Sequence, residues 1–306
     1  MSAPASNPSN AAPDGQLRRI PKTELVYTYA PKRQPVATVG PGERLLVETR
    51  TAFGEAELIH GQEVTGPPPG RADPLTGPIF VSGAEIGDAL AVHIEAIELV
   101  GDPVIGPYRG SSPLDWHALP VDILKVQDGQ LLVGRLSLQL RPMVGCIAVA
   151  PASETTPSTS VGDHGGNLDT RHIAPGATVL LPVFEHGAGL VLGDCHALQG
   201  DGEMTGTPPE TDAEVTIRVD VVKGLTLRRP RVLTADRFMT LASAATLEQA
   251  CALAIEDMVI ALAGQASLTP DEAYVLLTLC GDLEISQIVN SWATVRVAVD
   301  RTLLDA

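Results

Sequence analysis

The hydrophobic pattern over the first two thirds of the chain is that of β-strands. Apolar and polar residues alternate through Arg44–Thr49 and Glu214–Val222, which predicts strands with one buried face. Met143–Ala150 is almost wholly apolar, as expected of a strand that is buried on both faces. Turn signals recur at short spacing with no helices between them. The pattern therefore predicts antiparallel sandwich or barrel units with about a dozen strands.

Two glycine-containing dipeptides in this region predict hairpins. Asp128-Gly129 separates the strand-like segments 121–126 and 130–140, and Asp-Gly is a strong hairpin signal. Gly87-Asp88 lies in the same way between 78–82 and 89–99, so we expect the strands on either side of each turn to pair.

The periodicity becomes helical near the C-terminus. Thr246–Ala263 repeats its apolar residues at helical spacing, and Gly264 is a candidate C-cap. Thr269 is followed by proline and two acidic residues, which predicts a second helix over 270–280 with Thr269 as its N-cap. Residues 287–299 return to a β pattern, with a break expected at Asn290-Ser291.

These segments predict three parts of unequal character. Residues 1–18 are rich in Ala, Ser, Pro and Asn and bury too little apolar area to order alone, so we expect a disordered tail. Residues 19–225 should form a β-rich body that carries the active site. Residues 226–306 should form a smaller α+β C-terminal part with a helical hairpin.

Charge and cysteine usage narrow the classes of function. The net charge of −16 argues against nucleic acid or anionic lipid as partners, since phosphate contacts require clustered Lys and Arg. The four cysteines show no CxxC pairing, which is typical of a reducing compartment. No apolar run reaches the length of a membrane span, and the first residues lack a secretory pattern. We expect a cytoplasmic protein.

The candidate chemistry lies in 161–203, which holds four of the seven histidines. Asp194 and His196 are two residues apart at the end of an apolar run, so a strand would present both on one side. His164 comes from a separate glycine-rich loop. Two imidazoles with a carboxylate are ligand types of a divalent metal that activates water.

Spacing alone leaves this interpretation open. A histidine beside a strand is commonly a hydrogen-bonded structural residue, and no HExxH or complete EF-hand pattern occurs. The chain also lacks the GxSxG, Walker A and GxGxxG motifs of other catalytic classes. From spacing, the segment is a polar pocket in which a metal is one alternative.

Longer motifs point to a family. They are TGPIFVSGAEIGDAL at 76–90, PMVGCIAVAP at 142–151, HGGNLDT at 164–170 and LLPVFEHGAGLVLGDCHALQGDGE at 180–203. The chain resembles the acetamidase/formamidase family of amide hydrolases, and the resemblance runs from about residue 24 to 301.

The resemblance implies a mainly β, jelly-roll-like sandwich or barrel body with a smaller α+β C-terminal part. It implies hydrolysis of a short amide, of the formamide or acetamide type, to a carboxylate and ammonia by metal-activated water. The divalent metal is expected to be zinc, and the protein is expected to form a homo-oligomer. Relatives that act on lactams make a lactam or larger amide the alternative substrate.

The resemblance also assigns residues to roles by position. The assigned roles are metal binding (His164, Asp194 and His196), proton transfer (Glu203 and Asp169) and substrate binding (Asn167, Gly165, Gly166 and Gln199). The backbone N–H groups around Gly165-Gly166 are expected to hold the oxyanion.

The chain departs from the family pattern at two positions. Thr51 stands where the family usually has an aspartate, and Asp73 stands where an asparagine is usual. If that aspartate binds metal or carries a proton, Thr51 leaves a gap in the site. A catalytically impaired member that binds a small ligand is therefore a further alternative.

Overall fold

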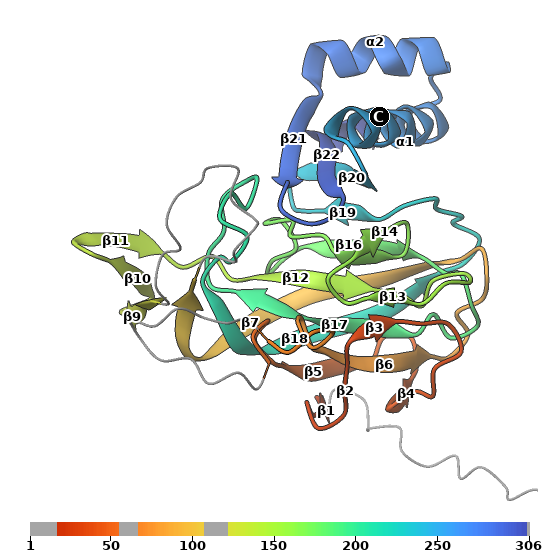
Figure 1. Cartoon of the computed structure of the whole chain (residues 1–306). Helices are drawn as coiled ribbons and strands as arrows, with labels where there is room; N and C mark the ends of the chain where they lie inside the picture. The colour runs from red at the N-terminus through yellow and green to blue at the C-terminus, as the bar shows by residue number, and fades with distance from the viewer. Residues whose placement is uncertain (1–16, 55–66, 107–121, 305–306) are drawn as a thin grey trace, which may run out of the picture.

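The computed structural model describes residues 17–54, 67–106 and 122–304 (Figure 1). The predicted disordered tail at 1–18 lies almost wholly outside these ranges. Residues 17 and 18 are described, and the first strand begins at Arg18, where it pairs with a strand of the body.

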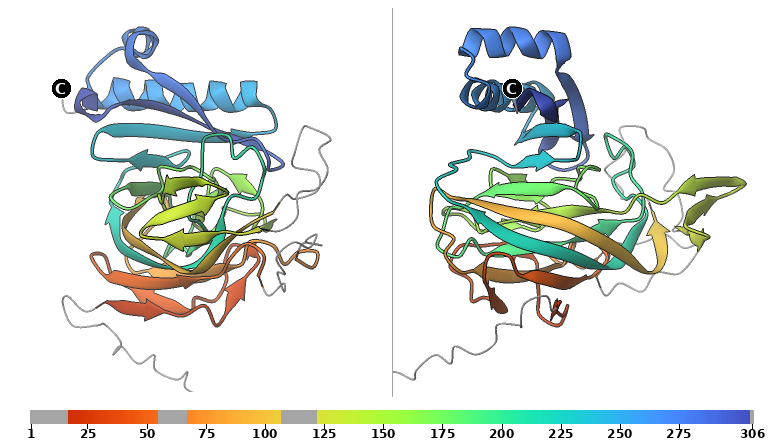
Figure 2. Two further views of the ribbon diagram at one scale, coloured as in Figure 1. Left: turned by 90° about the vertical axis from the view of Figure 1, so that its left-hand side faces the viewer. Right: turned by 180° about the vertical axis from the view of Figure 1, so that it is seen from behind.

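Curled, mostly antiparallel β-strands make up the body of the molecule (Figures 1 and 2). Its strands are β1 (Arg18–Ile20), β2 (Leu25–Val26), β3 (Thr28–Tyr29), β4 (Ala37–Val39), β5 (Arg44–Thr49), β6 (Leu75–Val81), β7 (Ala89–Ile105), β8 (Asp122–Ile123), β9 (Lys125–Gln127), β10 (Gln130–Val133), β11 (Leu136–Gln139), β12 (Met143–Ala148), β13 (Thr156–Pro157), β14 (Val161–Gly162), β15 (Gly165–Asn167), β16 (Thr178–Pro182), β17 (Leu190–His196), β18 (Glu210–Val222) and β19 (Arg231–Leu233).

A smaller α+β part lies at one end of the body, at the top of Figure 1. Its elements are β20 (Arg237–Ala244), α1 (Leu247–Gln265), α2 (Pro270–Cys280), β21 (Asp282–Gln287), β22 (Ala293–Asp300) and the 3₁₀-helix η1 (Arg301–Leu304). The prediction of a mainly β body with a smaller α+β C-terminal part is confirmed.

The longest strands, β7 and β18, pair with each other along most of their length. The alternation predicted in β18 is confirmed, since Val215, Ile217 and Val219 are fully buried. They pack in a core made mainly of Val, Leu, Ile and Ala side chains. Burial of this apolar area is the main stabilising contribution to the body.

The two predicted hairpins have different outcomes. The hairpin at Asp128-Gly129 is confirmed, because Gln127 pairs with Gln130 and both turn residues have positive φ. The hairpin at Gly87-Asp88 is wrong. β6 pairs with β2, β4 and β17, whereas β7 pairs with β8, β16 and β18. A turn signal reports only local backbone geometry, and here distant strands offer the buried partners.

Of the two predicted helix caps, Thr269 is confirmed and Gly264 is not. Thr246 caps α1, and Thr269 forms a capping box with Glu272 at the start of α2. The prediction that Gly264 ends α1 is wrong: the helix continues to Gln265 and is capped at Ala266. Alanines and a methionine of α1 pack on β20 and β22 in a second core.

β21 and β22 form an antiparallel pair whose connecting turn, residues 288–292, points back toward the body. The sequence prediction placed a single strand with a break at 290–291, and the break is in fact this whole turn. Within the described ranges, no single helix is long and apolar enough to cross a membrane. The bent pair α1 and α2 meets that criterion jointly, with 114° between the two helices.

Candidate functional site

The site begins at the end of β17, where Asp194 and His196 meet as their spacing predicted. His196 Nε2 lies 3.2 Å from Asp194 Oδ1, and both side chains are buried. Asp194 has a left-handed backbone (φ +55°), and it is skipped in the register between β12 and β17. This backbone conformation places its carboxylate over Gly145, where a Cβ would lie 2.6 Å from Asp194 Oδ2.

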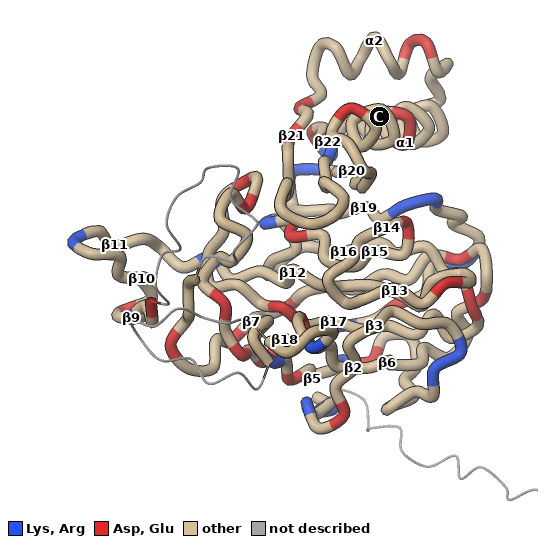
Figure 3. Tube along the Cα trace, in the orientation of Figure 1, with Lys and Arg blue, Asp and Glu red and all other residues tan. Residues whose placement is uncertain are grey.

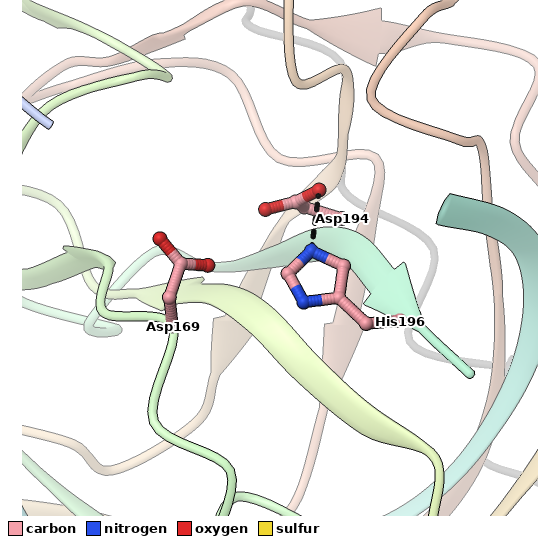
Figure 4. Close-up of side chains that lie close together, drawn as sticks. All are labelled: Asp169, Asp194 and His196. Carbon is pink, nitrogen blue, oxygen red and sulfur yellow. Dashed lines mark hydrogen bonds and ion pairs between the residues drawn. The ribbon is translucent and has the colours of Figure 1, made fainter. Parts of the chain in front are cut away.

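Asp169 completes a three-residue cluster with Asp194 and His196 (Figure 4). One ligand atom from each of the three lies within 4.8 Å of the other two, and all three residues are buried. Asp169 follows β15, so the cluster joins two segments of the predicted stretch.

Left-handed backbone recurs among the acidic residues of this site. The residues with positive φ are Asp73 (+48°), Asp169 (+44°), Asp194 (+55°) and Glu203 (+46°). Each costs roughly 1–3 kcal/mol, and such conformations persist where the surrounding structure imposes them, commonly at functional sites.

Asn167 joins the two aspartates of the cluster. With its amide oriented by the surrounding groups, Asn167 Nδ2 donates to Asp194 Oδ2 at 3.0 Å and to Asp169 Oδ1 at 2.9 Å. The amide oxygen then accepts from Asn290 Nδ2 at 3.3 Å. Asn167 therefore holds both carboxylates in one orientation.

Gln199 sets the tautomer of His196. Gln199 Nε2 donates to the backbone carbonyl of Asp169 at 2.7 Å, so Gln199 Oε1 faces His196 Nδ1, also at 2.7 Å. The Nδ1 proton is therefore donated to Gln199. In neutral His196 the Nε2 lone pair is then directed at the carboxylates, as it is in metal-binding histidines.

A cavity of about 240 Å³ reaches the cluster at Asp194. It is lined by Ala52, Phe53, Ala72, Asp73, Thr159, Asn167, Asp194, Glu203, Gly206, Thr207, Glu210, Val289, Asn290 and Ser291. Apolar and polar groups share the wall, so the cavity suits a small polar molecule with a short apolar substituent.

The electrostatics of the site are dominated by buried carboxylates. Burial and the neighbouring Asp194 charge raise the pKa of Asp169 to about 6. Burial also raises the pKa values of Asp73, Glu203 and Glu210 well above their usual range. Since charges that cannot be solvated repel one another, these groups compete for protons or for a cation.

His196 is the cationic partner of this cluster. Its burial opposes protonation, but the Asp194 and Asp169 carboxylates outweigh that effect and raise its pKa to about 9. Burial would likewise raise the pKa of Asp194, yet the adjacent imidazolium lowers it below the usual value.

The donor set fits a divalent metal. One imidazole nitrogen and the oxygens of Asp169 and Asp194 converge, and Glu203 and Glu210 each have a buried Oε2 atom without a hydrogen-bond partner. In the view of Figure 3 charged residues are spread over both parts of the molecule, whereas the site gathers five buried carboxylates. A dication would offset that excess of buried negative charge.

The structure places three of the predicted residues elsewhere. His164 is outside the cluster and packs edge-on against Tyr29, and Asp169 takes its place beside Asp194 and His196. A Cβ at Gly165 would lie 2.4 Å from the carbonyl of Ile147. One at Gly166 would lie 2.5 Å from that of Ser160. Both glycines allow strands to approach closely, and neither lines the cavity.

Of the two residues that depart from the family pattern, Asp73 lines the cavity and Thr51 does not. Thr51 is not in the cavity wall, and its backbone N–H donates to Asp212 Oδ1 at 2.8 Å. Asp73 lines the cavity with its Oδ2 atom 3.4 Å from the Asn167 amide. The raised pKa of Asp73 favours a neutral carboxylic acid, which can donate a hydrogen bond as an asparagine does.

Two residues of the site were missed from the sequence. Glu210 lies opposite His196 in the β17–β18 pair, with Oε1 at 3.4 Å from His196 Nε2. A register shift between Glu210 and Asp212 interrupts the pairing of β18 with β7. The alternation of apolar and polar residues in β18 therefore did not indicate where the Glu210 side chain points. Asn290 comes from the C-terminal part, and its only signal was the break in the β pattern.

Comparison with known proteins finds formamidases and acetamidases among the relatives. The model of the acetamidase/formamidase family matches residues 137–300. The formamidase of Methylophilus methylotrophus is 39% identical over 74 residues, which are 24% of this chain and 16% of that protein. The chain thus matches a minor part of the length of this curated relative.

Two solved structures match over nearly the whole chain. A predicted acetamidase/formamidase from Thermoanaerobacter tengcongensis has a TM-score of 0.91 and 34% identity, covering 94% of this chain and 97% of its own. An acetamidase from Bacillus halodurans has a TM-score of 0.90 and 34% identity, covering 94% and 98%. The fold is thus similar to that of both proteins over nearly their whole length.

Proposed function

The chain belongs to the acetamidase/formamidase family, and from this we propose that it hydrolyses a short linear amide of the formamide or acetamide type. Water adds to the amide carbonyl carbon, the C–N bond breaks, and the products at neutral pH are a carboxylate and ammonium. The observation that carries the proposal is the buried cluster of Asp169, Asp194 and His196 at a cavity of about 240 Å³.

We propose that Asp169, Asp194 and His196 hold a divalent metal, and that the metal is zinc. One nitrogen with carboxylate oxygens is a donor set that zinc accepts. When bound, such an ion supplies an acidified water and polarises the amide carbonyl. Gln199 supports the set by fixing the His196 tautomer, and Asn167 supports it by holding both aspartates.

We propose that Glu203 moves the proton. It lines the cavity, shares a hydrogen bond with Asp169 and has a buried Oε2 atom without a partner. Burial and the Asp169 charge raise its pKa, so ionised Glu203 is a stronger base than an ordinary glutamate. It therefore accepts the proton of the attacking water and returns it to the leaving nitrogen.

Metal analysis of the purified protein beside an ammonia-release assay tests this function. The substrates are formamide, acetamide and a five-membered lactam, each with and without chelator. We expect about one divalent ion per chain, release from the linear amides and loss of release with chelator. Chelator-insensitive release contradicts the metal role, and turnover of the lactam alone contradicts the substrate class.

Histidine variants provide the matched comparison. His196→Gln removes the imidazole of the cluster, and we expect loss of both metal and activity. His186→Gln changes an exposed histidine that pairs with Glu85, so it should keep both. Equal effects of the two substitutions would contradict the assignment of the site.

We also propose that the protein assembles as a homo-oligomer. Three side chains of α2, Tyr274, Val275 and Leu279, are 59%, 60% and 77% exposed. A second copy of the chain would cover this apolar surface. Sedimentation velocity should show a species larger than one chain, and Leu279→Glu should weaken it. A monomer at micromolar concentration contradicts the proposal.

We propose, finally, a cytoplasmic location. The four cysteines are all free, which fits a reducing compartment. Cell fractionation with an antibody against the chain should find it in the cytoplasmic fraction, and recovery from an extracytoplasmic fraction would contradict this.

A further inference from the structure

The turn between β21 and β22 brings the C-terminal part into the site. Its residues Val289, Asn290 and Ser291 form one wall of the cavity, although the other residues that line the cavity all come from the body. Asn290 Nδ2 donates to Asp169 Oδ2 at 3.0 Å and to the backbone carbonyl of Asn167 at 3.3 Å. One amide group therefore contacts the two residues that shape the cluster.

The turn itself is held rigidly by Gln287, which is fully buried. Gln287 Oε1 accepts from the backbone N–H groups of Val289 (2.9 Å) and Asn290 (3.0 Å). Its Nε2 donates to the carbonyl of Trp292 at 2.7 Å and to Thr294 Oγ1 at 2.9 Å. With its amide hydrogens and oxygen all in use, Gln287 fixes the position of Asn290.

The end of β21 and the turn after it also form hydrogen bonds with the loop that carries Glu203. Gly202 N–H donates to the carbonyl of Ser286 at 3.0 Å, and Ile288 N–H donates to the carbonyl of Gly202 at 3.3 Å. Two loops of the body, one with Asp169 and one with Glu203, are therefore hydrogen-bonded to the same segment of the C-terminal part.

We propose that Asn290 is a positioning residue: its side-chain amide orients Asp169 for metal binding, so that the C-terminal part completes the site. Asp169 needs such support because its backbone is left-handed and its carboxylate faces Asp194, a like charge. The hydrogen bond of 3.0 Å from Asn290 Nδ2 to Asp169 Oδ2 holds this carboxylate in one orientation. This inference rests on the proposed metal role of Asp169, Asp194 and His196.

The test compares the metal affinity of full-length variants from which metal has been removed. Asn290→Leu keeps the shape of the side chain but cannot donate, and we expect Zn²⁺ binding, measured by competition with a chromophoric chelator, to weaken about 10- to 100-fold. Ile288→Ala is the control in the same turn, because its 41% exposed side chain is outside the cavity wall, and it should bind as the natural protein does.

Kinetics and thermal unfolding separate positioning from folding and from substrate contact. For Asn290→Leu we expect kcat to fall while KM for the amide stays within about twofold, since the change acts through Asp169. If Asn290→Leu does not fold, Asn290→Ser, whose hydroxyl is too short to reach Asp169, should show the same loss.

Each outcome decides one of the two claims. Unchanged Zn²⁺ affinity in Asn290→Leu, or a raised KM with unchanged affinity, overturns the positioning role and leaves the proposed function intact. A natural protein that binds no Zn²⁺ overturns the proposed metal role and the positioning role with it.

Discussion

At the scale of single residues, the site depends on a left-handed backbone conformation that residues with a side chain rarely adopt. Asp169, Asp194 and Glu203 are all left-handed, and each carboxylate is directed inward by that conformation. Glycine is required where two of these groups pass a neighbouring strand. A Cβ on Gly145 would lie 2.6 Å from both Asp169 Oδ1 and Asp194 Oδ2.

Gly145→Ala should therefore damage the site more than the fold. The new methyl group must displace both carboxylates, and a misplacement of about 1 Å costs about 100-fold in rate. We expect kcat/KM for acetamide and the bound metal to fall together. Gly264→Ala, at a helical glycine with open space around it, is the control and should change neither. Normal metal content in Gly145→Ala would contradict the prediction.

Asp88 gives a pH-dependent contribution to stability. Lys223, together with the backbone N–H groups of Gly224 and Glu85, lowers the pKa of Asp88 to about 2. A lowered folded-state pKa stabilises the protein above the unfolded pKa near 3.8, and this stabilisation is lost as pH falls toward 2.

Asp88→Asn should therefore be less stable than the natural protein at pH 5, and the difference should shrink between pH 4 and pH 2.5. Urea unfolding at each pH measures it. A difference that grows on acidification would contradict the assigned pKa shift.

At the scale of elements, the two parts of the chain are locked by buried Arg296 of β22. Its side chain is fully buried and contacts Glu284, Asp201 and Ser286 at 2.8, 2.8 and 3.1 Å. Ser286 Oγ in turn accepts a hydrogen bond from Thr170 Oγ1 at 2.8 Å, and Thr170 is next to Asp169 in the chain. Arg296 thus reaches both site loops, as the turn at Asn290 does.

Arg296→Leu should destabilise the protein by about 1.5–3 kcal/mol, because it removes the charge-assisted contacts of Arg296 with Glu284 and Asp201, which keep their ion pairs with Arg237 and Arg171. Arg228→Leu is the control: Arg228 pairs with Glu256 at an exposed position, and its loss should cost below about 1 kcal/mol. Chemical unfolding measures both. Equal losses would show that burial of the Arg296 pair contributes nothing.

At the scale of the whole molecule, metal binding and stability should be coupled. The metal-free site holds several buried carboxylates close together. In the folded state these carboxylates either bind protons or repel one another. A ligand that binds only the folded state stabilises it, by about 2.7 kcal/mol at a hundredfold excess over Kd.

Adding Zn²⁺ to the metal-free protein should therefore raise Tm, and chelator should reverse the rise. His196→Gln should remove the effect, whereas His186→Gln should keep it. A Tm that does not respond to any divalent ion would contradict the coupling.

The sequence by itself determined what depends on neighbouring residues. Alternation predicted the strand at Glu214–Val222, the Thr-Pro-Asp-Glu signal predicted the start of α2 at Thr269, and two-residue spacing predicted that Asp194 lies beside His196. The contiguous motifs determined the family, because long runs of matched residues seldom occur by chance. Each of these signals is read within one element or one unbroken segment.

Only the tertiary structure decided which distant groups share the site. Asn290 meets Asp169 across 121 residues, and a bulge rather than alternation brings Glu210 to His196. His164 was expected in the cluster, yet its loop turns the ring toward Tyr29 and delivers Asp169 instead. Strand pairing and loop curvature set these contacts through packing of the whole chain, which spacing along one segment does not record.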